Sequence, residues 1–166
     1  KVPEKVKNIL IDDFSNAIGA EGMLAGQFLD LEAEDEKFNL TLKKFRKIQE
    51  MKTSLLIAIC TKTGAILGNA SKKEQSILFE FGVILGRIFQ IRDDILDQEG
   101  NETQMGKKAK KDQNLNKATI IRLKGMDYAK KEMLRLAENA KEKLMYLKKD
   151  TSTLSQLIDY LTVRNY

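Results

Sequence analysis

The stretch from Ser71 to Gly100 reads SKKEQSILFEFGVILGRIFQIRDDILDQEG. Its apolar residues recur every three or four positions, which is the spacing of one face of an α-helix. Ser71 followed by Glu74 is the capping-box arrangement that starts a helix, and Gly100 is a typical end. We therefore predict one long helix between these residues. The apolar positions on its core face are Ile77, Leu78, Phe81, Ile84, Leu85, Ile88, Ile91, Ile95 and Leu96.

The same helical spacing appears in other parts of the chain, and the single proline and abundant Leu, Ile, Lys and Glu suit long helices. The acidic run 32–36 and the lysine-rich stretch 100–118 read as loops. We expect one all-α domain, an antiparallel helical bundle. The further predicted helices span residues 6–20, 23–31, 41–67, 126–147 and 151–163.

Composition excludes several kinds of chemistry. The chain has no histidine and one cysteine, Cys60, so His-based zinc sites, Ser-His or Cys-His nucleophiles and an internal disulfide are excluded. The longest apolar stretch, residues 55–67, contains Thr61, Lys62 and Thr63, which makes it too short and too polar for a membrane span. We expect a cytoplasmic protein that does not act in a membrane.

Charge is unevenly distributed. Residues 1–100 carry 14 Lys and Arg against 16 Asp and Glu, whereas residues 101–150 carry 14 against 7. Such a basic segment can serve nucleic acid, anionic lipid or a phosphate-bearing substrate. A nucleic-acid-binding domain is one alternative, but it would need stacking aromatics, and the segment has only Tyr128 and Tyr146. We therefore expect no nucleic-acid partner.

The sharpest chemical feature is the sequence FQIRDDILD, from Phe89 to Asp97. Asp93 and Asp97 are four residues apart and share a helix face, with Gln90 one turn earlier. Like charges at this spacing repel, and a divalent cation with oxygen ligands would relieve the repulsion. The alternative interpretation is a solvated acidic helix end.

This sequence resembles the second aspartate-rich motif, FQxxDDxxD, of the trans-prenyl diphosphate synthase family, at every defined position. Residues 22–27, GMLAGQ, resemble the family's GM-x-G-G-Q element with one alanine for glycine, and residues 52–54 resemble its Lys-Thr-Gly with serine in the last place. Residues 106–119 resemble its GK…GAD…GKxT loop, and residues 150–165 resemble the ending of short-chain bacterial farnesyl synthases. The likeness covers nearly the whole chain in the right order.

The resemblance implies the isoprenoid synthase fold and a role for each matching residue. Asp93, Asp94 and Asp97 would hold or support Mg²⁺, with Mn²⁺ as a substitute, against the diphosphate of an allylic substrate. Lys52 and Lys107 would contact that diphosphate, and with Asp93 they form the expected catalytic set. The expected substrate-binding residues are Gln27, Lys52, Thr53, Phe89, Gln90 and Lys107.

Structural explanations stand beside these roles. Lys52 could be an ordinary solvated residue of a helix face, and Lys107 could be one of several lysines in a polar loop. The element at residues 22–27 could serve close helix packing alone. Phe89, with Phe79 and Phe81, could belong to the core.

The family has two facing aspartate-rich motifs, and no second DDxxD occurs in these residues. We therefore expect residues 1–166 to be the C-terminal part of a polyprenyl synthase domain, with the first motif absent and no turnover by this part alone. The implied reaction joins dimethylallyl or geranyl diphosphate to isopentenyl diphosphate and gives farnesyl diphosphate. The implied assembly is a homodimer. A non-catalytic regulatory subunit of a heteromeric prenyl synthase is the main alternative.

Overall fold

The computed structural model describes residues 1–35, 37–104 and 118–165, with the backbone alone for residues 101–104. Every regular element in these ranges is helical, which confirms the all-α prediction. The elements are α1 (Glu4–Ile18), α2 (Met23–Glu32), α3 (Leu42–Gln49), the π-helix η1 (Glu50–Ser54), α4 (Leu55–Leu67), α5 (Lys72–Gln104), α6 (Ile120–Lys124), α7 (Met126–Met145) and α8 (Ser152–Val163).

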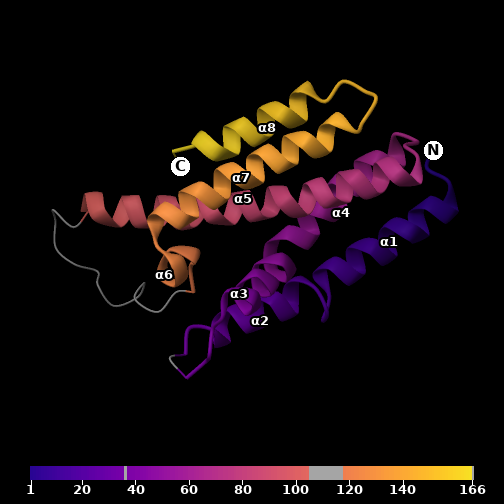
Figure 1. The fold of residues 1–166 in the computed structure, drawn as a ribbon. Coiled ribbons are helices and arrows are strands. Elements are labelled where there is room, and N and C mark those ends of the chain that lie inside the picture. Colours follow the sequence, from indigo (N-terminus) through magenta and orange to yellow (C-terminus); the bar gives the residue numbers. More distant parts are fainter. Residues whose placement is uncertain (36, 105–117, 166) are drawn as a thin grey trace.

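Helix α5 is the central helix, and η1, α4, α6, α7 and α8 all contact it. It contacts α4 on one side and α7 on another, and α8 packs on both α5 and α7. Figure 1 shows α4 turning back into α5, α7 returning along α5, and α8 returning along α7, so neighbouring helices are antiparallel. Helix α1 packs on α4, and α2 packs on η1. No helix among the described residues has the length and apolar character needed to cross a membrane.

The core follows the predicted face of α5. Phe81, Ile88 and Ile95 are each fully buried, and they are spaced seven residues apart, which keeps them on one side of the helix. Leu136 of α7 and Ile158 of α8 are equally buried against them. Each such side chain contributes about 1.5–3 kcal/mol by leaving water. This packing holds α5 rigidly, and with it the acidic motif near its end.

The start of α5 is as predicted and its end is not. The Ser71 N–H donates to Glu74 Oε2 at 2.7 Å, and the Glu74 N–H donates to Ser71 Oγ at 3.3 Å, which completes the capping box. The Ser71 hydroxyl also donates to Glu74 Oε2 at 2.7 Å, and this bond, followed by the one from the Ser71 N–H, lowers the pKa of Glu74 below its ordinary value. The predicted end at Gly100 is wrong, because the helix continues to Gln104. A glycine inside a helix costs only about 1 kcal/mol and need not end it.

The region 41–67 is helical throughout, as predicted, but it contains a π-helix from Glu50 to Ser54. Apolar spacing does not reveal such a local widening of the helix. Helix α6 was also not predicted, since it lies between the predicted loop at 100–118 and the predicted helix at 126–147. Thr119 caps its start by accepting a bond from the Arg122 N–H at 3.1 Å. The helices predicted at 6–20, 126–147 and 151–163 are confirmed within two residues at each end.

Candidate functional site

Two glycines of α5 bring it unusually close to the helix that carries Lys52 and Thr53. A Cβ added at Gly86 would lie 2.5 Å from the Cα of Ser54, and one added at Gly82 would lie 2.5 Å from the Cα of Ala58. Real side chains do not fit at such distances, so only glycine permits this approach. The consequence is that η1 lies directly against the turn of α5 that precedes Gln90.

A third glycine brings α2 against η1. A Cβ at Gly26 would lie 2.3 Å from the backbone nitrogen of Lys52. The element at residues 22–27 therefore serves close helix packing, the structural explanation considered for it. Gln27, expected near the substrate, has an exposed side chain on α2.

Lys52 is held by a carboxylate of α2. Its Nζ lies 2.5 Å from Asp30 Oδ2, and both side chains are partly buried. Lys52 is thus not an ordinary solvated residue, because its ammonium group is fixed in a partly buried ion pair. The π-helix turn and the Gly26 contact place its backbone, and Asp30 places its charge.

A chain of hydrogen bonds joins three of the predicted site residues. Thr53 Oγ1 donates to Gln90 Oε1 at 3.4 Å, and Gln90 Nε2 donates to Asp94 Oδ1 at 3.2 Å. Asp94 Oδ2 in turn accepts from the backbone N–H of Ile120 at 3.1 Å. Asp94 is almost fully buried, with 2% of its surface exposed. It therefore ties α5 to the first turn of α6 and holds Gln90 in place.

Asp93 faces another part of the chain. Its Oδ1 is paired with the guanidinium group of Arg164, which follows α8. The same guanidinium group stacks over the ring of Phe89, 4.6 Å from the ring centroid. Arg92 donates to the backbone carbonyl of Arg164 from Nε at 2.8 Å and from Nη2 at 2.6 Å. Phe89 is thus partly buried: it packs against the hydrophobic core and lies beneath the Arg164 guanidinium group.

The three aspartates consequently divide into two kinds. Asp94 bonds to protein groups with both oxygens, whereas the side chain of Asp93 is one-third exposed and Asp97 is exposed. Within the described ranges no three His, Cys, Asp or Glu side chains gather around one point as a complete metal cage would require. Mg²⁺ commonly takes one or two protein carboxylates and fills its shell with water and phosphate oxygens, and Asp93 and Asp97 fit that pattern.

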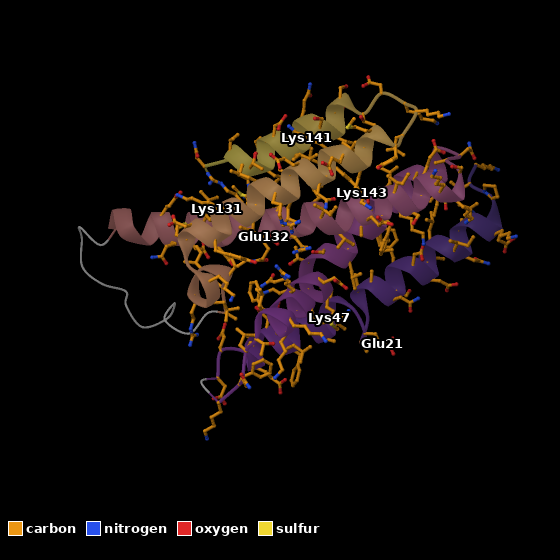
Figure 2. All side chains as sticks on the ribbon, viewed as in Figure 1. Glu21, Lys47, Lys131, Glu132, Lys141 and Lys143 are labelled. Carbon is orange, nitrogen blue, oxygen red and sulfur yellow. The ribbon has the colours of Figure 1, made fainter. Side chains whose placement is uncertain are left out.

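Lys107, the second expected diphosphate contact, lies outside the described residues, as does most of the lysine-rich stretch. Three of the four lysines of α7 form ion pairs with other helices. Lys130 pairs with Glu99 of α5, Lys141 with Asp159 of α8, and Lys143 with Glu80 of α5. Lys141 and Lys143 are labelled in Figure 2. These lysines join helices to one another, which does not favour the nucleic-acid alternative.

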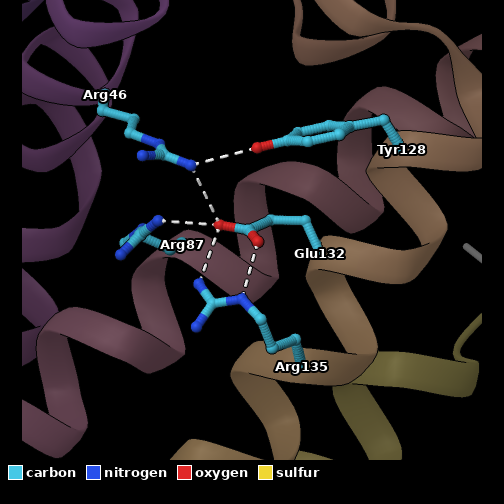
Figure 3. A network of polar contacts seen from close by, with 5 residues as sticks. All are labelled: Arg46, Arg87, Tyr128, Glu132 and Arg135. Carbon is cyan, nitrogen blue, oxygen red and sulfur yellow. Dashed lines mark hydrogen bonds and ion pairs between the residues drawn. The ribbon is translucent and has the colours of Figure 1, made fainter.

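A polar cluster that was not predicted from the sequence joins α3, α5 and α7 (Figure 3). Glu132, which is 7% exposed, accepts from Arg46 at 3.2 Å, from Arg87 at 3.1 Å and from Arg135 at 2.8 and 3.0 Å. Arg46 also donates to the hydroxyl of Tyr128 at 3.1 Å. The bond from Arg135, with the charges of the other two arginines, lowers the pKa of Glu132 despite its burial. Burial lowers the pKa of Arg87.

Three residues of importance were missed, and two had a readable signal. Glu132 stands where the apolar face of α7 should continue, between Ala129 and Leu136, and a charge in such a position needs a partner. Asp30 lies one helical turn after Gly26 and Gln27, on the same helix as the glycine that contacts Lys52. The contact of Arg164 with Asp93 joins residues 71 positions apart and left no local signal.

Comparison with known proteins gives a consistent result. Residues 5–160 match the model of the family described as polyprenyl synthetase. The chain is 36% identical over 166 residues to farnesyl diphosphate synthase of Geobacillus stearothermophilus and 33% identical over 169 residues to that of Escherichia coli. These alignments cover 100% and 99% of the chain but 55% and 56% of the relatives. The chain thus spans about half the length of the curated relatives it matches.

Solved structures show the same fold. An FPP/GFPP synthase from Zymomonas mobilis matches with a TM-score of 0.81 and 28% identity, over 96% of this chain and 52% of that one. A geranyltransferase from Helicobacter pylori, complexed with magnesium and isoprenyl diphosphate, matches with a TM-score of 0.75 and 27% identity, over 96% and 52%. The fold is therefore the one found in farnesyl diphosphate synthases, and the chain belongs to the polyprenyl synthetase family.

Proposed function

We propose that residues 1–166 form the C-terminal part of a prenyl transferase domain and hold the diphosphate of an allylic substrate. One observation carries this proposal: the Thr53–Gln90 hydrogen bond fixes the Lys52-Thr53 turn against the face of α5 that bears Asp93 and Asp97. A partly buried ammonium group and two accessible carboxylates on adjoining elements suit a metal-bridged diphosphate.

The proposed reaction is head-to-tail condensation. The allylic diphosphate ionises, the double bond of isopentenyl diphosphate attacks C1, and loss of a proton restores an alkene. Lys52, with Lys107, neutralises the departing diphosphate, while Thr53 and Gln90 line its site. Mg²⁺ held by Asp93 and Asp97, with Asp94 supporting the helix turn between them, would supply further charge neutralisation. Electrostatic stabilisation of the leaving group is then the main catalytic contribution.

Farnesyl diphosphate is the product we propose. The names of the Geobacillus and Escherichia relatives support it, as does the resemblance of residues 150–165 to short-chain farnesyl synthases. Because the chain spans about half of these relatives, the isopentenyl diphosphate site and the first aspartate-rich motif are assigned to a part outside residues 1–166. A diphosphate held from one side only would not ionise, so residues 1–166 alone should not turn over.

We also propose a homodimer in the cytoplasm. Apolar side chains exposed on α1 and α2 support burial of this surface against further protein. They include Ile11, Leu24, Phe28 and Leu31, each more than half exposed. The cytoplasmic location is proposed independently of the assembly; one relative at 32% identity is named as mitochondrial. Sedimentation analysis of the chain at several concentrations checks the assembly.

The transferase proposal is tested by adding the N-terminal half of a relative to the chain. The chain is incubated with geranyl diphosphate, labelled isopentenyl diphosphate and Mg²⁺, alone and with the N-terminal half of the Escherichia coli farnesyl diphosphate synthase. We expect no product from the chain alone, labelled farnesyl diphosphate from the mixture, and none from a mixture that contains Asp93→Ala. Lys148→Gln, an exposed charge change near the start of α8, is the matched control and should retain the product.

Two outcomes would count against the proposal. Product from the chain alone would show that its site is not half of a catalytic site. A stable complex of the two halves that makes no product would favour the alternative of a non-catalytic regulatory subunit.

A further inference from the structure

The segment that follows α8 closes over the acidic motif of α5. Arg164 contacts three residues within slightly more than one turn of that helix: its guanidinium group pairs with Asp93 and stacks on Phe89, and its carbonyl accepts two bonds from Arg92. Residues spaced by three and four share one side of a helix, which is why a single arginine reaches all of them. We call Phe89, Arg92, Asp93 and Arg164 the latch.

Burial and attachment to the end of α8 hold Arg164 in place within the latch. The side chain of Arg164 is 12% exposed, whereas that of Asp93 is 33% exposed. The backbone N–H of Arg164 still bonds to the carbonyl of Tyr160 at 2.9 Å, so the residue is fixed directly at the end of α8. Asn165 adds a further bond, accepting from Arg92 at 3.3 Å. A long exposed tail would not hold one carboxylate oxygen in this way.

The guanidinium group occupies the same carboxylate that the proposed function assigns to a metal. The Arg164 N–H bond to Asp93 Oδ1 opposes close coordination of a divalent cation by the same oxygen, because the two positive groups repel each other. If the Asp93 carboxylate is released from Arg164 for only a fraction of the time, its apparent affinity for a divalent cation is reduced by that fraction.

We propose that the guanidinium group of Arg164 closes the latch by taking the place of a divalent cation at Asp93. Arg164 must then leave this carboxylate before the cation binds. The part of the proposal that concerns the metal rests on the proposed function, and the latch itself does not. Release of Arg164 also frees the ring of Phe89 and the guanidinium group of Arg92, so one event opens this side of α5.

The first experiment tests the latch without any metal. Deuterium exchange is followed in the peptide that covers residues 158–166, in the full chain and in Asp93→Asn. Loss of the carboxylate charge should release Arg164 and speed exchange at the end of α8 by about threefold or more. Asp159→Asn removes a carboxylate of α8 itself, which pairs with Lys141, and serves to show the effect of an unrelated ion pair. Unchanged exchange in Asp93→Asn would overturn the latch.

The second experiment tests competition. Mn²⁺ replaces Mg²⁺ as a paramagnetic probe, and free Mn²⁺ is measured by electron paramagnetic resonance in the full chain, Arg164→Gln, Arg164→Lys and Lys148→Gln. If the latch is closed about nine-tenths of the time, Arg164→Gln should bind Mn²⁺ about tenfold more tightly. Lys148→Gln removes the same charge at the other end of α8 and should bind as the unaltered chain does.

Arg164→Lys separates competition from general electrostatics. It keeps the charge but loses the planar stack on Phe89, so we expect part of the gain in affinity. Equal gains in Arg164→Gln and Lys148→Gln would mean only a long-range charge effect and would overturn competition at Asp93. A further outcome is faster exchange in Asp93→Asn with no Mn²⁺ binding in any variant. That result would refute both the competition and the metal role in the proposed function. The contact of Arg164 with Asp93 would then be structural only.

Discussion

Lys52 and Asp30 form a 2.5 Å ion pair between η1 and α2, and the neighbouring residue Thr53 donates a hydrogen bond to Gln90 of α5. Asp30→Asn keeps the shape of the side chain and removes its charge. We expect the free energy of unfolding to fall by about 1–3 kcal/mol, because Lys52 is left partly buried with a weaker partner. Urea denaturation measures the change. Asp12→Asn, at an exposed position of α1, should alter stability by less than about 0.5 kcal/mol; an equal loss in both variants would contradict the role given to Asp30.

The contact of Gly26 with the Lys52 backbone predicts a large cost for one methyl group. A Cβ there would lie 2.3 Å from a backbone nitrogen, so Gly26→Ala must push α2 away from η1 and should destabilise by about 2 kcal/mol or more. Gly64→Ala is the matched control, since a Cβ at that position of α4 meets nothing within 4 Å. It should stabilise by about 0.5–1 kcal/mol through its higher helix propensity. Thermal unfolding of both variants checks the opposite signs, and a neutral Gly26→Ala would refute the close packing.

Ser54 stands where the family motif commonly has glycine, and its hydroxyl is buried. No hydrogen-bond partner for Ser54 Oγ is found among the described residues. Ser54→Ala should therefore be neutral or stabilising by up to about 1 kcal/mol, since it removes a buried polar group and adds no volume. Ser54→Val adds volume beside Gly86 and should destabilise by about 1–3 kcal/mol. Calorimetry of the two variants tests this, and a clear loss of stability in Ser54→Ala would show that the hydroxyl has a partner.

Glu132 predicts a pH dependence of stability. Its pKa is lower in the folded chain than its ordinary value of 4.5, chiefly because of its bond to Arg135. The contribution of ionised Glu132 to the free energy of unfolding is therefore fully present above pH 4.5. It is lost as the pH falls through the pKa that Glu132 has in the folded chain. Glu132→Gln should destabilise by about 3 kcal/mol at pH 7, because three guanidinium groups lose their shared carboxylate.

The difference between Glu132→Gln and the unaltered chain should shrink as the pH falls below 4.5. Glu74 and Asp150, whose pKa values are also lowered, affect both proteins alike and cancel in the comparison. Glu138→Gln, at an exposed position of the same helix, should follow the unaltered chain at every pH. Urea denaturation across pH 3–7 measures these differences. A constant gap between the two curves would refute this titration.

Local spacing predicted much of the fold because helices are local structures. The buried series Phe81, Ile88 and Ile95 and the capping box at Ser71 were readable from positions a few residues apart. The π-helix at Glu50–Ser54 was not, since the buried residues on either side of the inserted position, Gln49 and Ser54, are polar and give no apolar signal. Helix α6 escaped because five residues give too little periodicity to recognise.

Part of the candidate site was predictable for the same reason. The shared face of Gln90, Asp93 and Asp97 follows from helical spacing. The separate environments of Asp93 and Asp94 do not, because they depend on Arg164 and on the backbone of Ile120, which lie far along the chain. Which carboxylate is accessible is decided by tertiary packing, and no local pattern records it.

Calorimetric titration of the chain with a non-hydrolysable allylic diphosphate analogue tests most directly whether Mg²⁺ on the acidic face of α5 holds the diphosphate. It is done with and without Mg²⁺, and in parallel with Asp93→Ala and Lys148→Gln. We expect binding that requires Mg²⁺, that is lost in Asp93→Ala and that is retained in Lys148→Gln. Binding that is equally strong without Mg²⁺ or in Asp93→Ala would contradict this expectation, because the diphosphate would then be held by groups other than the acidic face of α5.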